Sequence, residues 1–546
     1  MLRLIDVGSA TAKTADQWRA AQGARELDAL SALGPVAGAE EAERTARVWL
    51  EDRLDILGLR VPWADDWRMA GPSPLWRYHL HYHEHLADLA WLAGRTSDPA
   101  MVRRLALDLR GWNKVWASGG APAWDPYPVS VRLVSWLRIL AWAGPLLDAP
   151  ERDLLERGIA RHVASLRSRL EWHIDGNHLL RNTSALVLGS SVLEGPESES
   201  LQDEAVTLFE RTLAEQVPGD GIHLERTPMY HVRALRDAIE VEACLKTRRR
   251  NLGASSVAII DRMAAALPWM LRADGELWML NDTAHDHGVD LAPLLARAAA
   301  VAEPPSGLRY FGDAHLVVIV ADRDRLRIDL GGPAPAHQPG HAHAGALGFE
   351  LDVEGFPFIV DGGCSGYDGD PWRAYLRGTA AHNTVAIDGK DQSELWATFR
   401  VGARAAVSGV ACSGTPHLLT IAAVCRPYHA RGVVHRREFR REGRVLVIND
   451  VVQGAARRLV ESFLHFDPAW DAASSSAHQF VLTRPGARVS VTVNGATDVS
   501  LHRGQGDPRI GWYARGFNHV VPSWTLRLRE ERYVERPWRI TITPDA

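Results

Sequence analysis

Cysteine is scarce in this chain, and long apolar runs are missing from it. The four cysteines, Cys244, Cys364, Cys412 and Cys425, are scattered without a CxxC pair. This scatter predicts neither a disulfide framework nor a zinc knuckle. No stretch predicts a membrane-spanning helix, and no apolar leader follows the first residues. We therefore expect no membrane insertion and a cytoplasmic protein as the sequence stands, or a periplasmic or secreted one if a leader was removed.

An excess of positive charge is also missing. The chain has 62 Lys and Arg against 67 Asp and Glu, a net charge of -5, with 46% hydrophobic and 24% charged residues. These proportions are typical of a globular protein and exclude a globally basic nucleic-acid binder, although a local basic groove stays compatible with them. With 546 residues the chain is too long for one ordinary core, so we expect two or more domains.

The pattern of apolar residues changes near residues 304–307. Before this point apolar residues recur at spacings of three and four between short Gly, Asp and Pro breakers, which predicts antiparallel helix hairpins. After it, β-branched residues alternate with polar ones, which predicts antiparallel strands. The expected fold is α+β and multidomain, with an incomplete (α/α) toroid over residues 1–305 and an antiparallel β-sandwich over residues 306–546. A bent double layer of helix hairpins would leave a central groove.

Residues suited to chemistry cluster between positions 340 and 384. His341 and His343 precede an apolar run, and Asp361 and His382 follow within forty-odd residues. Strand alternation predicts that both histidines lie on one face of a strand, together with Leu347 and the apolar residues after it. Histidine and aspartate together suit a borderline metal such as zinc. The alternative is a histidine-rich sheet edge whose hydrogen bonds are satisfied within the protein.

Three further blocks lie in the helical half. His79, His81, His83 and His85 would form i,i+4 pairs on a helix, where one pair could hold a metal or one face could line a groove. Asn177, His178 and Arg181 begin another predicted helix, where amide, imidazole and guanidinium groups favour an anion such as a carboxylate, unless Asn177 is only an N-cap. Pro228 fits the first turn of a third helix and brings Tyr230 and His231 to its open end.

In their order along the chain, these blocks resemble the heparinase II/III superfamily of polysaccharide lyases. The resemblance rests on Asn177-His178, on residues 225–231, 340–344, 361–363 and 381–384, and on Trp124–Pro128 and Trp76–Tyr78. It implies an (α/α) toroid followed by a β-sandwich, and β-elimination of an acidic polysaccharide that contains uronic acid. Alginate and glycosaminoglycan lyases are among the members of that superfamily.

The resemblance also implies a role for each matching residue. Asn177 and His178 match the group that neutralises the uronate carboxylate, Tyr230 the general acid and base, and His341 the second catalytic group. His343, Asp361 and His382 match a structural metal triad, whose closed ligand set suits zinc better than calcium. The remaining residues expected at the substrate are Arg181, Arg226, His231, Tyr127, Trp76 and Tyr367.

One departure and two alternative functions accompany this interpretation. Gly345 stands where many relatives carry Asp, so no role that needs this aspartate is carried over. The first alternative is a carbohydrate-binding or exopolysaccharide-biosynthesis-associated protein with weak or no lyase activity. The second is an α/α-toroid glycoside hydrolase, which needs two cleft carboxylates; Glu225 and Asp125 are the candidates.

Overall fold

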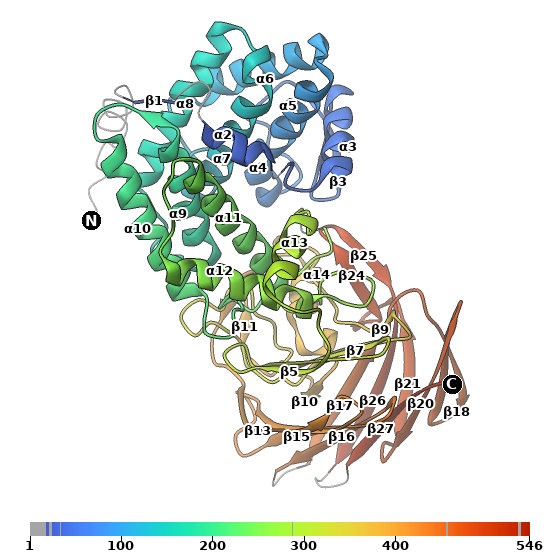
Figure 1. Ribbon diagram of the computed structural model, residues 1–546. Helices are drawn as coiled ribbons and strands as arrows, with labels where there is room; N and C mark the ends of the chain where they lie inside the picture. Colours follow the sequence, from blue (N-terminus) through green and yellow to red (C-terminus); the bar gives the residue numbers. More distant parts are fainter. Residues whose placement is uncertain are drawn as a thin grey trace, which may run out of the picture. The chain divides into compact units, whose positions relative to one another are not determined.

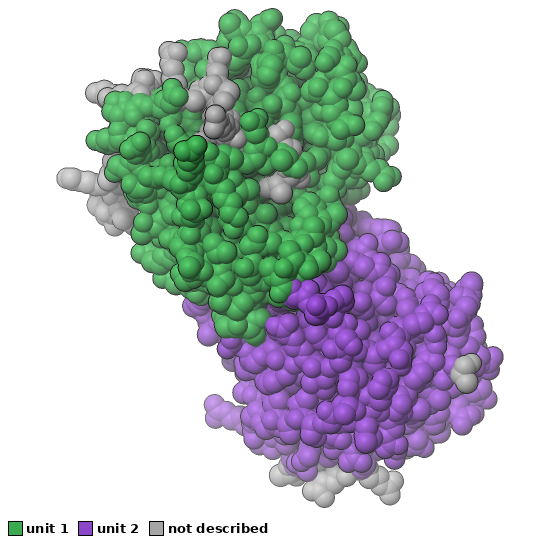
Figure 2. All heavy atoms as spheres, viewed as in Figure 1, with its two compact units in different colours: residues 1–221, 232–265, 288–301 green, residues 222–231, 266–287, 302–546 purple. Residues whose placement is uncertain are grey.

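The computed structural model describes residues 18–20, 25–32, 34–286, 288–454, 457–532 and 537–545 (Figure 1). The chain divides into two compact units, which Figure 2 colours separately. Unit 1 comprises residues 1–221, 232–265 and 288–301, and unit 2 comprises residues 222–231, 266–287 and 302–546. Two short segments of the helical half, 222–231 and 266–287, therefore belong to the same compact unit as the strands.

Unit 1 is helical, as the spacing of apolar residues predicts. Its central helix, α7, is buried along most of its length and packs against α2, α5, α8 and α9. Proline in the first turn and an Asp or Ser cap mark several helix starts; the Asp98 carboxylate, for example, accepts the N–H of Ala100 at 2.8 Å. The principal helices, blue to green in Figure 1, are α2 (Arg25–Ala32), α3 (Ala39–Leu50), α4 (Pro74–Leu80), α5 (Glu84–Thr96), α6 (Pro99–Trp116), α7 (Pro126–Ala143), α8 (Ala149–Arg167), α9 (Gly176–Ser191), α10 (Ser198–Gln216), α11 (Pro228–Thr247), α12 (Ala254–Ala266) and α13 (Ala292–Val301).

The histidine-rich stretch from His79 to His85 is not one helix, contrary to expectation. Helix α4 ends at Leu80 and α5 begins at Glu84, so His81 and His83 lie in the turn between them. His83 has a left-handed backbone with φ of 57°, which an uninterrupted helix does not allow. The i,i+4 pairing expected on a continuous helix therefore does not form.

Unit 2 is built from antiparallel sheets. Its large sheets have the strand orders β13-β14-β15-β16-β27-β20-β19-β18, β5-β6-β7-β8-β9 and β10-β17-β26-β21. One buried apolar cluster draws side chains from all three, including Ile319, Ile448 and Leu526. The strands of these sheets are β5 (Gly307–Phe311), β6 (Leu316–Ala321), β7 (Asp324–Asp329), β8 (Phe349–Val353), β9 (Phe356–Ile359), β10 (Val385–Ile387), β13 (Ala406–Thr415), β14 (Leu418–Arg426), β15 (Val434–Glu442), β16 (Val445–Gln453), β17 (Arg458–His465), β18 (Asp471–Ser476), β19 (Gln479–Arg484), β20 (Ala487–Asn494), β21 (Asp498–Arg503), β26 (Trp524–Arg532) and β27 (Trp538–Pro544).

Loops between these strands carry most of the residues singled out in the second half of the chain. His341 and His343 were expected on a strand, but β8 begins only at Phe349 and both histidines lie in the loop before it. Two backbone turns shape this loop: the Ala342 N–H donates to the Pro339 carbonyl at 3.0 Å, and the Gly348 N–H donates to the Gly345 carbonyl at 2.9 Å. Such turns break strand alternation, so the shared face inferred from alternation does not apply.

Three shorter elements complete the surroundings of that loop. Helix α14 (Pro371–Arg377) begins with the Asp370 carboxylate accepting the Arg373 N–H, and the 3-10 turn η3 (Thr379–Ala381) leads into His382. The strands β11 (Leu395–Trp396) and β12 (Arg400–Val401) pair as a two-stranded hairpin. In the described ranges of the chain, no helix combines the length and the hydropathy that crossing a bilayer requires.

Candidate active site and metal centre

The buried carboxylate of Asp282 joins the candidate residues of unit 2. Its two oxygens lie 2.8 Å from Nδ1 of His341 and 2.8 Å from Nε2 of His343. The guanidinium of Arg373 donates to both oxygens as well. Burial alone would raise the pKa of Asp282, but Arg373 and the two histidine hydrogen bonds hold it well below its ordinary value. An ionised Asp282 therefore fixes the orientation of both histidine rings.

Tyr230 lies beside His341 in the same unit. The two ring centroids are 4.3 Å apart, and the Tyr230 hydroxyl is 2.5 Å from the hydroxyl of Tyr367. Burial raises the pKa of Tyr367 well above its ordinary value, and the neighbouring Tyr230 and Asp282 add to this rise. Either hydroxyl can donate in this pair, so the Tyr230 oxygen can accept a hydrogen bond from Tyr367.

His341 is held between two carboxylates. Its Nδ1 faces Asp282, and its Nε2 lies 3.9 Å from a carboxylate oxygen of Glu225. An ionised partner at Nδ1 requires that nitrogen to donate, so Nε2 is the atom at which His341 can exchange a proton. Glu225 is 2% exposed, so its carboxylate belongs to the buried surroundings of His341 and not to the protein surface.

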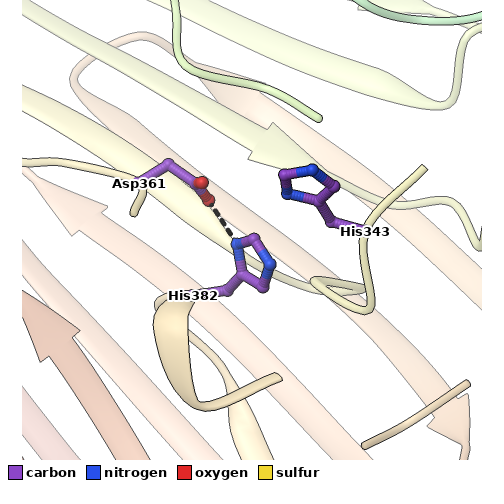
Figure 3. Close-up of side chains that lie close together, drawn as sticks. All are labelled: His343, Asp361 and His382. Carbon is purple, nitrogen blue, oxygen red and sulfur yellow. Dashed lines mark hydrogen bonds and ion pairs between the residues drawn. The ribbon is translucent and has the colours of Figure 1, made fainter. Parts of the chain in front are cut away.

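The three predicted metal ligands come together in unit 2. His343, Asp361 and His382 are all buried, and their ligand atoms lie within 4.8 Å of one another (Figure 3). They reach this point from the loop before β8, from the end of β9 and from the residue after η3. Asp361 accepts a hydrogen bond from Nδ1 of His382 at 2.8 Å.

The donor atoms of this triad suit a metal ion. Because Nε2 of His343 donates to Asp282, its Nδ1 keeps a lone pair. That Nδ1 and Nε2 of His382 are buried, and neither has a hydrogen-bond partner among the described residues. Two buried imidazole nitrogens and a carboxylate form a ligand set that zinc accepts, and Asp282 supplies the outer carboxylate that often supports a metal-bound histidine.

Burial and nearby charge act differently on the two histidine ligands. Burial lowers the pKa of His343 to about 4, and Asp282 offsets this only in part. Burial also opposes protonation of His382, but the Asp361 carboxylate outweighs it and the net pKa is raised. A divalent cation would replace the proton that Asp361 otherwise favours on His382.

Gly345 packs directly against His382 of the candidate metal triad. A Cβ atom at this position would lie 3.0–3.2 Å from three atoms of the His382 ring. Contacts this short require the ring to shift by a few tenths of an ångström. The absence of a side chain at Gly345 therefore allows the His382 ring to pack closely against this loop.

Unit 1 carries a second group of predicted residues at the start of α9. Asp175 is the N-cap of this helix, so Asn177 lies within the first turn and is not the cap. The ring centroid of His178 lies 4.3 Å from that of Tyr127 with the two rings tilted by 36°, and its Nδ1 lies 3.3 Å from a carboxylate oxygen of Glu171. Glu171 orients His178 much as Asp282 orients His341.

Several residues expected at the substrate are held inside the protein. Trp76 and His231 are 0% exposed, so direct contact with a substrate would need a rearrangement of the core. Arg226 is buried and donates to Asp329 and to the Gly332 carbonyl. Arg181 is paired with Asp237 in unit 1. Of the six residues expected at the substrate, Tyr127, Arg181 and Tyr367 are half-buried.

Reasoning from the sequence missed Asp282 and did not assign Arg373 to the site. Asp282 is 59 positions before His341, so no local spacing joins them. The available signal was an Asn-Asp pair after the apolar run Leu277–Leu280. An Asn-Asp pair also predicts a turn with no catalytic role, and Asn281 and Asp282 do lie in a turn here.

Comparison with known families identifies two matches that together span most of the chain. Residues 63–300 match a family described as Heparinase II/III N-terminus. Residues 303–536 match a family described as Heparinase II/III-like, C-terminal.

Solved structures with the same fold include three carbohydrate lyases. A crystal structure of Heparinase III aligns with a TM-score of 0.75 and 16% identity, covering 94% of this chain and 86% of that one. The heparan sulfate lyase HepC mutant from Pedobacter heparinus aligns with a TM-score of 0.63 and 16% identity, covering 92% and 83%. A chondroitinase AC lyase aligns with a TM-score of 0.55 and 11% identity, covering 98% and 83%. Together they confirm a helical N-terminal region followed by a C-terminal antiparallel β-sheet domain.

One relative is similar in sequence over part of the chain. The FtsZ-localized protein C of Caulobacter vibrioides is 28% identical over 251 residues. The aligned part is 46% of this chain and 41% of that protein, so the chain spans less than half of its relative's length.

Proposed function

The chain belongs to the heparinase II/III-like family, and from that premise we propose that it is a polysaccharide lyase that cleaves a uronic-acid-containing polymer by β-elimination. The observation that carries this proposal is the hydrogen-bonded set Tyr367–Tyr230 beside His341–Asp282 in unit 2. It brings a phenol and an imidazole together at ring-contact distance. Both are groups that move protons in general acid–base catalysis.

The elimination removes the proton on C5 of the uronate and expels the oxygen linked to C4. The C5–H bond breaks, its electron pair forms the C4–C5 double bond, and the C4–O4 bond breaks as O4 takes a proton. The C5 proton is weakly acidic while the neighbouring carboxylate is charged. The enzyme therefore needs a base, a proton donor for O4 and a group that neutralises the carboxylate.

Tyr230 is our candidate for the proton transfers at C5 and O4. Tyr230 takes the C5 proton as a phenolate, and a hydrogen bond donated by Tyr367 would stabilise that phenolate before the transfer. As the proton is taken, the negative charge passes from the Tyr230 oxygen to the sugar. The same oxygen then returns a proton to O4. His341, whose Nδ1 is fixed on Asp282, offers Nε2 as the second proton-exchanging atom.

Asn177 and His178 are our candidates for carboxylate neutralisation. Asn177 lies in the first turn of α9, where backbone N–H groups favour an anion, and His178 is oriented by Glu171 and Tyr127. An incomplete toroid for the helices and a sandwich for the strands are part of the same proposal.

The metal belongs to this proposal as a structural zinc ion held by His343, Asp361 and His382. Bound zinc would supply a fixed positive charge that pins three loop segments together. The chain's own residues do the rest: Asp282 holds His343 for the metal and His341 for the reaction. Metal binding and the position of His341 would then share one carboxylate.

A second candidate function is a carbohydrate-binding role with little turnover. It is favoured by the relative from Caulobacter vibrioides, whose name describes a location with FtsZ rather than a reaction. The two candidates differ in one respect that is easily measured, because a binding protein leaves its polymer intact.

The proposal is tested on a panel of acidic polysaccharides that includes alginates and glycosaminoglycans. We expect ultraviolet absorbance from the 4,5-unsaturated product on at least one of them. Reducing ends that form without this absorbance would favour a hydrolase using carboxylates such as Glu225 and Asp125. Binding without any cleavage would favour the second candidate.

A further inference from the structure

We propose that the hairpin from Leu395 to Val401 is a sugar-binding subsite for an acidic sugar next to the bond that is cleaved. This inference rests on the proposed function, because it takes the residues around Tyr230 and His341 as the reaction centre. It goes beyond that function by assigning substrate recognition to a segment that has no role in the proposed reaction. Strands β11 and β12 form the hairpin, and residues 397–399 form its tip.

The hairpin exposes two large aromatic side chains. Trp396 is 58% exposed and Phe399 is 42% exposed, which places both among the few large apolar side chains on the described surface. Exposed rings of this size cost free energy in water unless a partner covers them. Flat rings also suit the apolar C–H face of a sugar, because dispersion and the ring quadrupole act over the whole face.

The hairpin tip contacts the residues of the proposed reaction centre. The Phe399 ring centroid lies 5.7 Å from that of His341 and 5.1 Å from that of Tyr367. Gly340, next to His341, also lies against the tip, since a Cβ at that position would be in ordinary van der Waals contact with the Phe399 Cβ at 3.6 Å. A sugar stacked on Phe399 would therefore be one ring away from His341 and Tyr367.

Two buried arginines hold the tip in place. Nε and Nη2 of Arg373 donate to the Thr398 carbonyl at 3.1 Å, and Nη1 of Arg377 donates to the same carbonyl at 2.9 Å. Arg377 also donates to the Ala397 carbonyl at 3.2 Å. Because Arg373 is bonded to Asp282 as well, the hairpin and the catalytic histidine share one anchor. A platform fixed in this way loses little conformational freedom on binding.

The charge at the hairpin points to an acidic sugar. Arg400 directly follows Phe399 and is exposed. A guanidinium pairs with a carboxylate through two parallel hydrogen bonds, which a neutral sugar does not offer. Aromatic rings with an adjacent arginine therefore match a uronate, which has one apolar face and one carboxylate.

The kinetic test compares Trp396→Ala, Phe399→Ala and Arg400→Gln with wild type, on the polymer that wild type cleaves best. We expect each variant to raise KM by about tenfold, equivalent to about 1.4 kcal/mol, with kcat changed much less. Arg400→Gln should also weaken the dependence of KM on salt, because it removes one charge from the encounter. The matched control is Tyr310→Ala, which removes an aromatic side chain 43% exposed on β5 and should leave KM unchanged.

A binding test separates this inference from the proposed function. Calorimetric titration of Tyr230→Phe with oligosaccharides of the same polymer should give a Kd that rises by about tenfold when Trp396→Ala is added. If wild type cleaves the polymer but the hairpin variants keep its KM and Kd, the subsite is wrong and the lyase proposal stands. If wild type cleaves no polymer but binds one through Trp396, the subsite stands and the lyase proposal fails. If the oligosaccharide binds equally well to every variant, the hairpin has no part in recognition.

Discussion

Two histidine-rich stretches of this chain differ in the partners of their rings. In unit 1, Nδ1 of His81 accepts the indole N–H of Trp112 at 3.3 Å, and Nδ1 of His83 accepts that of Trp136 at 2.8 Å. In unit 2, the rings of His341, His343 and His382 are bonded to carboxylates of Asp282 and Asp361. The same residue type thus packs among tryptophans in one unit and pairs with ionised acids in the other.

The partners determine what each stretch can do. Burial, with a smaller contribution from neighbouring arginines, lowers the pKa of His81 and of His85 to about 3, so these rings stay neutral and act as parts of a core. A carboxylate partner instead orients a ring, fixes its tautomer and leaves the other nitrogen for a proton or a metal. Histidine density alone therefore predicts neither catalysis nor metal binding, whereas a buried acid at hydrogen-bond distance favours both.

The largest expected effect is on turnover. Tyr230→Phe should lower kcat by about a hundredfold to ten-thousandfold, because only the proton-transferring oxygen is lost. The control is Tyr375→Phe, which removes a hydroxyl from α14 in the same unit and should keep wild-type rates. Initial rates and thermal melting are measured on the same preparations. A Tyr230→Phe variant with near-normal kcat would remove Tyr230 from the mechanism.

The next effect concerns the carboxylate that distinguishes unit 2. Asp282→Asn leaves Arg373 buried without its charge partner and should destabilise the protein by about 3–5 kcal/mol. Activity and bound metal should fall together, because His341 and His343 both lose their fixed partner. Denaturant unfolding, metal analysis and initial rates follow the three losses. Full activity together with full metal content in this variant would contradict the shared role of Asp282.

The third prediction separates His341 from His343. His341→Ala should lose activity but keep its metal and its Tm, because His341 is outside the triad and partly exposed. His343→Ala should lose metal as well, and with it the stability that a ligand bound only to the folded state adds, about 2.7 kcal/mol at a hundredfold excess over Kd. Metal content, Tm and initial rates are compared.

The His81→Asn variant serves as the control from unit 1, since the asparagine oxygen can replace Nδ1 as an acceptor for Trp112. It should keep its metal and its turnover. If His341→Ala strips the metal and His343→Ala keeps it, the two assignments are reversed. Metal loss in His81→Asn would mean that the comparison between the two stretches is wrong.

The smallest expected effect is the pH dependence of unit 1. The folded-state pKa of His81 is about 3, below its ordinary value of 6.5, so above pH 6.5 the ring is neutral in both folded and unfolded chains. Between pH 6.5 and about 3 only the unfolded chain takes up the proton, and stability falls by at most about 1.4 kcal/mol per pH unit for this ring. His81→Asn should reduce the slope of unfolding free energy against pH by that amount. An unchanged slope would show that His81 is not buried as a neutral ring.

Periodicity in the sequence predicted the helical and the strand halves, because a helix or strand that buries one face repeats its apolar residues at a regular spacing. The convergence of His343, Asp361 and His382 was also predicted, through the family resemblance of the blocks that carry them. The role of Asp282 was not, because its partners lie 59–91 positions away and meet it only after folding. The same holds for the break at His83, where a left-handed backbone interrupts an otherwise regular helical pattern.

The mass of the product tests the central claim most directly. The best substrate is digested in water enriched in oxygen-18, and the fragments are weighed by mass spectrometry. β-Elimination predicts that each new non-reducing end is lighter than the hydrolysis product by one water molecule, and that the fragments take up no label through cleavage. Fragments that have gained a labelled water would identify a hydrolase and contradict the assignment of Tyr230 and His341 to an elimination.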